Sequence, residues 1–172
     1  MKLGLRSSAI SFLAIILLAG CLNDLPTIAP DMEEKLQSVF GLKNMNQSFQ
    51  LEIENNEKTF QSGSDIRLKI MNTSPHSIYF DIDSHIKLLT IKDAEWEEVK
   101  NGITYKGTLV ISPQDTPLLD YAKTRVKPDL RDEFQNTDQK ELVRILIIGE
   151  LMDNDVRTGE FVGAYVDVYI GP

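Results

Sequence analysis

Alternating apolar and polar residues fill most of the chain after residue 48. In "FQLEIE" (49–54) and "DIRLKIMN" (65–72) every second side chain is apolar, which is the period of a strand with one buried face. Similar short segments rich in apolar residues follow as "SIYFDI", "IKLLTIK", "GTLVIS", "LVRILIIGEL" and "EFVGAYVDVYI". The pattern predicts about seven strands.

Turn residues separate these segments, at Gly63-Ser64, 73–75, Asn101-Gly102, Ser112-Pro113 and 153–155. Strands at such short spacing, with little helix between them, are typical of an antiparallel β-sandwich. The alternation disfavours a parallel sheet covered on both faces, whose strands are continuously apolar. We therefore expect a mainly β protein, with an antiparallel β-sandwich over residues 48–172.

One segment before the strands has the period of a helix. In "PDMEEKLQSVFG" (30–41) one helical face carries four apolar residues, Met32, Leu36, Val39 and Phe40. Acidic residues near the start suit the helix dipole, and Gly41 is placed to end the helix. The sequence predicts a short N-terminal helix, packed on the domain in preference to lying near a membrane.

The segment 113–140 has no sustained period and carries Pro117, Pro128 and many charges. Within it, "KPDLRDEF" (127–134) is compatible with one helical turn that has Pro128 at its first position. Loops of this length are uncommon inside a sandwich unless they are functional or mobile. This segment is therefore a candidate partner surface.

The first twenty-one residues form a separate unit. Met1 to Arg6 is positively charged, "AISFLAIILLAG" (9–20) is an apolar run too short for a comfortable bilayer span, and Cys21 follows. The sequence Leu18-Ala19-Gly20-Cys21 resembles the lipobox of bacterial lipoprotein signal peptides at all four positions. We leave open the simpler interpretation of an ordinary cleaved signal beside an unpaired cysteine.

The lipoprotein resemblance implies that the thiol of Cys21 receives diacylglycerol and that cleavage falls between Gly20 and Cys21. It divides the chain into a signal peptide (1–20), a lipidated cysteine with tether and short helix (21–47), and the β-domain (48–172). Since one acyl chain alone anchors only marginally, two or three chains give stable attachment. The implied location is the cell membrane or outer membrane, with the domain outside the cytoplasm.

A second, looser resemblance concerns the β-domain. The stretch "TFQSGSDIRLKIMNTSPHSIYFDI" (59–82) has a polar turn with glycine, a strand ending in asparagine, a turn and another strand. It is similar to one region of immunoglobulin-like bacterial domains. The resemblance implies an immunoglobulin-like β-sandwich without the usual cysteine pair, and it transfers no function.

The charge and the cysteine content limit the classes of partner that the protein can bind. The 172 residues have a net charge of −8, and removing the first twenty leaves 16 basic and 26 acidic side chains. Nucleic acid is excluded as a partner because phosphate binding needs clustered lysine and arginine. Membrane attachment therefore has to come from Cys21, and a single cysteine gives no internal disulfide.

The candidates for metal chemistry are few. His76 and His85 lie near Asp81 and Asp83, but a zinc site needs three or four converging ligands, and solvated loop histidines are the better interpretation. The "DND" of residues 153–155 suits calcium, yet the remaining ligands of a calcium-binding loop are missing and a hairpin turn explains it. We expect no metal site and no cofactor.

The sequence also lacks catalytic signatures. It has no G-x-S-x-G elbow, P-loop or G-x-G-x-x-G motif, so we expect no enzyme. Trp96, among acidic residues, is a candidate for stacking on sugar or protein, but covering a sheet edge or lying in a turn is the plainer role. The predicted function is a lipid-anchored binding module that contacts another envelope protein. A small-ligand or calcium-binding lipoprotein using the acidic loops is the alternative.

Overall fold

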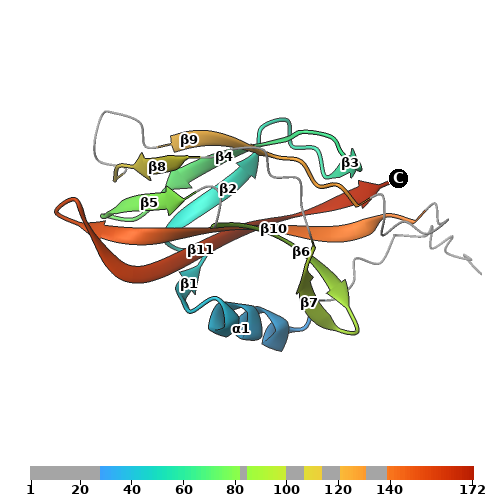
Figure 1. The fold of residues 1–172 in the computed structure, drawn as a ribbon, viewed down its shortest axis with the longest axis horizontal. Helices are drawn as coiled ribbons and strands as arrows, with labels where there is room; N and C mark the ends of the chain where they lie inside the picture. The colour runs from blue at the N-terminus through green and yellow to red at the C-terminus, as the bar shows by residue number, and fades with distance from the viewer. Residues whose placement is uncertain (1–27, 82–84, 100–106, 114–120, 131–138) are drawn as a thin grey trace, which may run out of the picture.

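The described part of the chain forms a mainly β structure with one short helix, as the sequence predicts (Figure 1). This computed structural model describes residues 28–81, 85–99, 107–113, 121–130 and 139–172. Within these residues the elements are α1 (Pro30–Val39), β1 (Leu42–Met45), β2 (Phe49–Ile53), β3 (Thr59–Gln61), β4 (Ile66–Asn72), β5 (Ser77–Asp81), β6 (Ile86–Lys92), β7 (Glu95–Glu98), β8 (Thr108–Ile111), β9 (Tyr121–Val126), β10 (Glu141–Asp153) and β11 (Val156–Gly171).

A long hairpin of β10 and β11 organises the larger sheet, which has eight strands in the described part of the chain. β11 pairs in parallel with β1 along one half and with β3 along the other. β10 pairs antiparallel with β6 and β5, which in turn pair with the outer strands β7 and β8. The sheet is therefore mixed, which corrects the prediction of a purely antiparallel arrangement.

The smaller sheet, in the order β2-β4-β9, is antiparallel and faces the larger one (Figure 1). The alternation in β2 and β4 is confirmed, because their apolar side chains enter a core shared by both sheets. Its most enclosed members include Phe49, Ile66, Phe80, Val143 and Val168, all at most 1% exposed. Phe49 and Phe80 meet edge to face across the two sheets, with ring centroids 5.1 Å apart.

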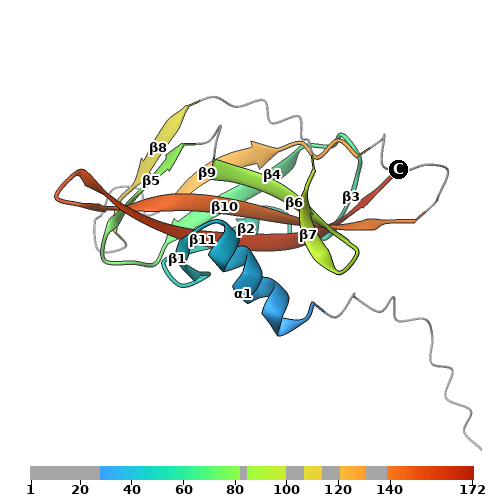
Figure 2. The same ribbon diagram turned by 60° about the horizontal axis from the view of Figure 1, so that its bottom comes forward.

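Helix α1 covers the opposite face of the larger sheet (Figure 2). Met32 and Leu36 are buried, but Val39 is 76% exposed, so only part of the predicted apolar face is buried. Gly41 follows the helix with φ +61°, a conformation that suits glycine, as its predicted role at the helix end requires. A Cβ added to Gly163 of β11 would come within 2.7 Å of Cδ1 of Leu42 on the neighbouring strand β1, so side chains pack closely on this face of the sheet.

The prediction of about seven strands was too low, since eleven occur in the described residues. The additional ones are short: β1, β3, β7 and β9. β9 lies inside the segment 113–140 that the sequence leaves irregular, and β1 lies within residues 21–47 and pairs with β11. No helical turn forms over residues 127–130, where Leu130 is buried and its N–H donates to Ser62 Oγ at 2.8 Å.

Among the described residues, no helix combines the length and the apolar character that crossing a membrane requires.

A buried asparagine links the two sheets at one end. Asn72, the last residue of β4, is 2% exposed, and its Nδ2 donates to the carbonyl oxygens of His76, Ile111 and Ser112 at 2.7, 3.2 and 3.0 Å. Its Oδ1 accepts from the N–H and hydroxyl of Ser74 at 2.9 and 2.8 Å. One side-chain amide thus provides hydrogen-bond partners both for the turn after β4 and for the end of β8.

Replacing Asn72 with alanine is expected to lower the free energy of unfolding by about 2–4 kcal/mol, because buried carbonyls lose their donor and Ser74 its acceptor. Urea denaturation of the two proteins measures the difference. Asn55→Ala is the control, since Asn55 accepts only from the exposed Glu57 N–H; it is expected to change stability by less than about 0.5 kcal/mol. Equal losses in both variants would contradict the linking role.

Candidate functional site

The predicted site of lipid attachment lies outside the described residues. Leu18, Ala19, Gly20 and Cys21 all precede residue 28, where the described chain begins. Asp83, a candidate partner of the histidines, also lies outside them. The lipid attachment and the cleavage between Gly20 and Cys21 therefore stay predictions from the sequence.

The two histidines lie in different surroundings. His76 is exposed in the turn after β4, as expected. His85 is not a solvated loop residue: it is half-buried, its Nδ1 accepts from the Asp81 N–H at 3.2 Å, and its ring meets Phe161 edge to face. Burial lowers the pKa of His85, and the nearby Asp81 carboxylate only partly opposes this. Among the described residues, no three metal-binding side chains come together.

The "DND" sequence forms the turn of the long hairpin, as predicted. Asp153 pairs with Val156 across a two-residue loop, and Asn154 and Asp155 both have positive φ, at 49° and 64°. These angles match the tight turn that joins twisted antiparallel strands. The hairpin accounts for the acidic residues, and the calcium alternative gains no support from this geometry.

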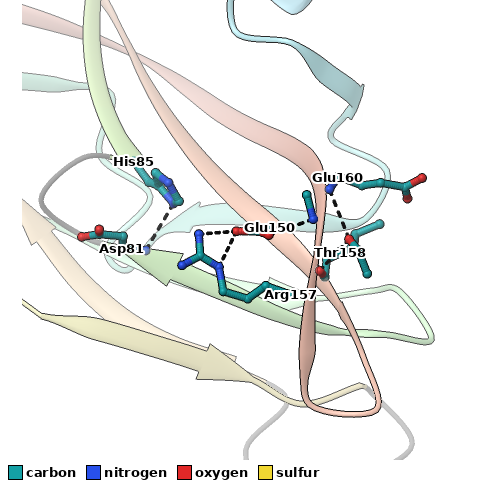
Figure 3. Close-up of polar contacts among 8 residues, drawn as sticks. Asp81, His85, Glu150, Arg157, Thr158 and Glu160 are labelled. Atoms are coloured by element: carbon teal, nitrogen blue, oxygen red, sulfur yellow. Dashed lines mark hydrogen bonds and ion pairs between the residues drawn. The ribbon is translucent and has the colours of Figure 1, made fainter.

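Close to that turn, charged side chains gather around a bulge in the hairpin (Figure 3). The register shifts between Glu150, opposite Phe161, and Met152, opposite Arg157. The Gly159 N–H donates to Glu150 Oε1 at 2.8 Å, and the hydroxyl of Thr158 donates to the Leu151 carbonyl at 2.8 Å. Side chains thus satisfy backbone groups that the bulge removes from the ladder.

Glu150 is 3% exposed and is held by charge-assisted bonds. Arg157 Nε donates to Glu150 Oε2 at 2.6 Å, Arg157 Nη2 forms an ion pair with the same oxygen, and the guanidinium lies 4.4 Å from the Tyr79 ring centre. Burial acts to raise the pKa of Glu150, but the bonds from Arg157 and Gly159 outweigh it and lower that pKa. We interpret this cluster as structural, because each of its bonds stabilises the bulge.

A second charged group lies inside the face that α1 covers. Arg144 of β10 is 1% exposed, and its Nε and Nη2 donate to the two carboxylate oxygens of Asp167 on β11, both at 2.8 Å. The guanidinium lies between two aromatic rings, 3.5 Å from the centre of Tyr165 and 4.4 Å from that of Trp96. Stacking and a bidentate ion pair together compensate the buried charge.

Two donors of this stack stay without a partner. Arg144 Nη1 and Trp96 Nε1 are both buried and have no hydrogen-bond acceptor among the described residues. The hydroxyl of Tyr165 donates to Glu33 Oε2 of α1 at 3.3 Å, and burial raises the pKa of Tyr165. Trp96 itself lies in the outer strand β7, so its predicted role at a sheet edge is confirmed.

Beside this stack, a groove of about 460 Å³ lies between α1 and the hairpin of β6 and β7. Its apolar lining consists of Met32, Leu36, Val39, Phe40, Leu89, Ala94 and Trp96. Lys35 of α1 and Glu95 of β7 form an exposed ion pair at 3.8 Å that joins the two walls. This groove is the strongest candidate for a binding site in the described part of the chain.

A second hollow, of about 570 Å³, lies on the outer side of the smaller sheet. Its lining is polar, from Glu52, Glu54, Asn56, Lys69 and Lys123 besides one isoleucine, and Lys123 and Glu54 form an ion pair within it. The hollow shows no apolar wall on which a ligand could be held.

Sequence reasoning missed Arg144, Glu150 and Arg157. A signal for the first two was present, because each is a charge inside the apolar segment 142–151. A charge that cannot avoid burial needs a partner, and that partner is the residue to search for. Nothing in the sequence indicates that Asp167 and Arg157 are those partners, since the pairing depends on the register of the hairpin.

Comparisons with known proteins give little beyond this geometry. The sequence matches neither a protein-family model nor a curated protein. Among solved structures, the chain is similar to Spo0M, a sporulation control protein from Bacillus subtilis, at 12% identity and a TM-score of 0.35. The match covers 73% of this chain and 50% of that one, so this chain spans half the length of that structure. A likeness at this level supports no assignment of function.

The ion pair of Arg144 predicts an unequal response to removing either partner. Asp167→Asn is expected to cost about 3–5 kcal/mol of stability, because it leaves a buried guanidinium without a counter-charge. Arg144→Met is expected to cost less, since Asp167 is 27% exposed and water can solvate it. Urea denaturation at pH 7 measures both, and a larger loss in Arg144→Met would contradict the argument.

The lowered pKa of His85 predicts a pH dependence of stability. Because the pKa in the folded state lies below the unfolded value of about 6.5, the unfolded state binds more protons below that pH. The contribution of His85 is complete above about pH 6.5 and is lost as the pH falls toward the folded pKa. His85→Gln is expected to flatten the stability curve below about pH 6.5. An unchanged slope in His85→Gln would refute the assignment.

Proposed function

We propose that this chain is a bacterial lipoprotein whose β-domain is held outside the cytoplasm by lipid on Cys21 and acts as a non-enzymatic binding module. The observation that carries the proposal is the apolar run that ends in Leu18-Ala19-Gly20-Cys21. The proposed location is the cell membrane or outer membrane, and the proposed partner is another envelope protein.

The distance between Cys21 and the fold supports a short tether. Helix α1 begins at Pro30, nine residues after Cys21, and a fully extended chain of that length reaches about 30 Å. An anchored Cys21 would therefore keep the α1 side of the domain near the membrane surface. Attachment at that end leaves the smaller sheet, on the opposite side, directed away from the membrane (Figure 2).

We further propose that the domain is a disulfide-free relative of immunoglobulin-like sandwiches. Two facing sheets around one core support this, as do the strand, turn and strand of β4 and β5. The parallel strands β1 and β3 and the helix α1 depart from that pattern. They are additions at the edge and outer face of the larger sheet.

Binding is supported over catalysis by how the buried charged groups are used. Arg144 is paired with Asp167, and Glu150 with Arg157, so both buried charges serve internal contacts. The groove beside α1 offers a mainly apolar lining in which the charged groups Lys35 and Glu95 pair with each other. Such a lining suits the binding of an apolar group and offers it no reactive side chain.

Cys21→Ser is expected to abolish lipid addition and cleavage after Gly20, because only a thiol forms the thioether. The variant would leave the lipid-anchored fraction and keep its full-length mass, as measured by detergent partition and intact mass spectrometry. Gly20→Ala, which keeps a residue that the lipobox accepts, is the matched control and is expected to be processed normally. A Cys21→Ser protein that is still cut after Gly20 and stays anchored would refute the proposal.

A further inference from the structure

The groove between α1 and the hairpin of β6 and β7 has the size and lining of a site for a small apolar ligand. Its volume of about 460 Å³ falls within the range of about 300–1,000 Å³ for small-molecule pockets. Its lining residues Met32, Leu36 and Leu89 are 7%, 4% and 2% exposed, so the apolar wall continues into the packed interior.

One polar atom of this wall lacks an acceptor. Trp96 lines the groove, and its Nε1 is buried without a partner in the described part of the chain. Because that nitrogen is itself buried, it is not exposed in the groove, and the indole offers an occupant only its apolar part. The wall therefore suits an apolar chain, which packs against it without a hydrogen bond from Trp96.

The charges around the groove favour a neutral ligand over a carboxylate. Behind the indole, Arg144 is already balanced by Asp167. Glu95 and Glu98 line the groove, and each is paired with a lysine, Glu95 with Lys35 at 3.8 Å and Glu98 with Lys87 at 3.0 Å. The one lysine of the described lining is thus already paired, so the groove offers a carboxylate no free counter-charge. A neutral, ester-linked acyl chain fits it better than a free fatty acid.

The proposed lipid anchor would present such a chain close to the groove. Between Cys21 and Ile28, the first described residue, seven residues reach at most about 25 Å. Met32, a residue of the groove, follows four positions later. A tether this short keeps the chain within reach of the groove, and the groove competes for that chain with the bilayer, where the same methylene groups are also buried.

We propose that the groove between α1 and β7 takes one ester-linked acyl chain of the anchor on Cys21, packed against Met32, Leu36 and Trp96. This inference rests on the lipid attachment of the proposed function. The remaining acyl chains stay in the bilayer, and the domain is held against the membrane with α1 facing it.

Photo-crosslinking of the complete lipidated protein tests this. Cells grown on a fatty acid that carries a diazirine incorporate it into phospholipids and into lipoproteins, and irradiation of their membranes joins it to its neighbours. Mass spectrometry then shows which peptides carry a crosslink, and whether the lipid belongs to Cys21 or to a phospholipid. We expect peptides of α1 and β7 joined to the lipid of Cys21.

A variant with a larger side chain in the groove is compared with a variant that carries the same side chain elsewhere on α1. Ser38 lines the groove from the exposed side of α1, so Ser38→Phe fills it, while Glu34 is exposed on the same helix outside the lining, so Glu34→Phe adds the same ring elsewhere. Crosslinks to α1 and β7 are expected to fall at least about tenfold in Ser38→Phe and to persist in Glu34→Phe, a difference that corresponds to about 1.4 kcal/mol. Circular dichroism confirms that both variants are folded.

The outcomes separate the inference from the proposed function. If the intact mass shows lipid on Cys21 but crosslinks are missing from α1 and β7, or join them only to phospholipids, the anchor is not the occupant and the proposed function stands. If Cys21 carries no lipid, the proposed function fails, and this inference fails with it. Because Trp96 is the single tryptophan of the chain, its emission supplies a second measurement: a shift between lipidated protein and Ser38→Phe is expected, and identical spectra would count against the site.

Discussion

The burial of β10 on both faces is the constraint on which the rest of this structure depends. One face enters the core between the two sheets, and the other lies under α1 and β1. Residues 142–151 are accordingly all buried, although an antiparallel strand with one solvated face would alternate. The apolar segment "LVRILIIGEL" is therefore the strand that needs a third layer, and α1 provides it.

Two charges inside that strand follow from the same constraint. Arg144 and Glu150 cannot reach water, and an unpartnered buried charge is costly. Both find their partners on β11, as Asp167 and Arg157, so the register of the hairpin is fixed by electrostatics as well as by apolar packing. A slip of one residue would turn either charge to the wrong face. The lowered pKa of Glu150 shows that its hydrogen bonds outweigh the penalty of burial.

The sequence predicted the elements whose pattern is local and missed those whose pairing is distant. β2 and β4 were recognised because apolar and polar residues alternate in a strand that buries one face. The hairpin turn was recognised because the residues of "DND" tolerate positive φ. The strands β1, β3 and β9 are short, and each pairs with a strand remote in the sequence. The short strand β7 was missed although its partner β6 directly precedes it, because its sequence "EWEE" carries a single apolar residue. The groove was equally hidden, since it arises where α1 meets β7, more than fifty residues further along the chain. Trp96 was singled out, but the guanidinium behind it was not.

That guanidinium joins the core to the outer face of the protein. Trp96 stacks on Arg144, Arg144 is fixed by Asp167, and Tyr165 on the other side of the guanidinium reaches Glu33 of α1. Both walls of the groove, α1 and β7, are thus positioned by one buried side chain of the central strand. Both walls are tied to the hairpin through this stack, because β7 contacts it by Trp96 and α1 by Glu33.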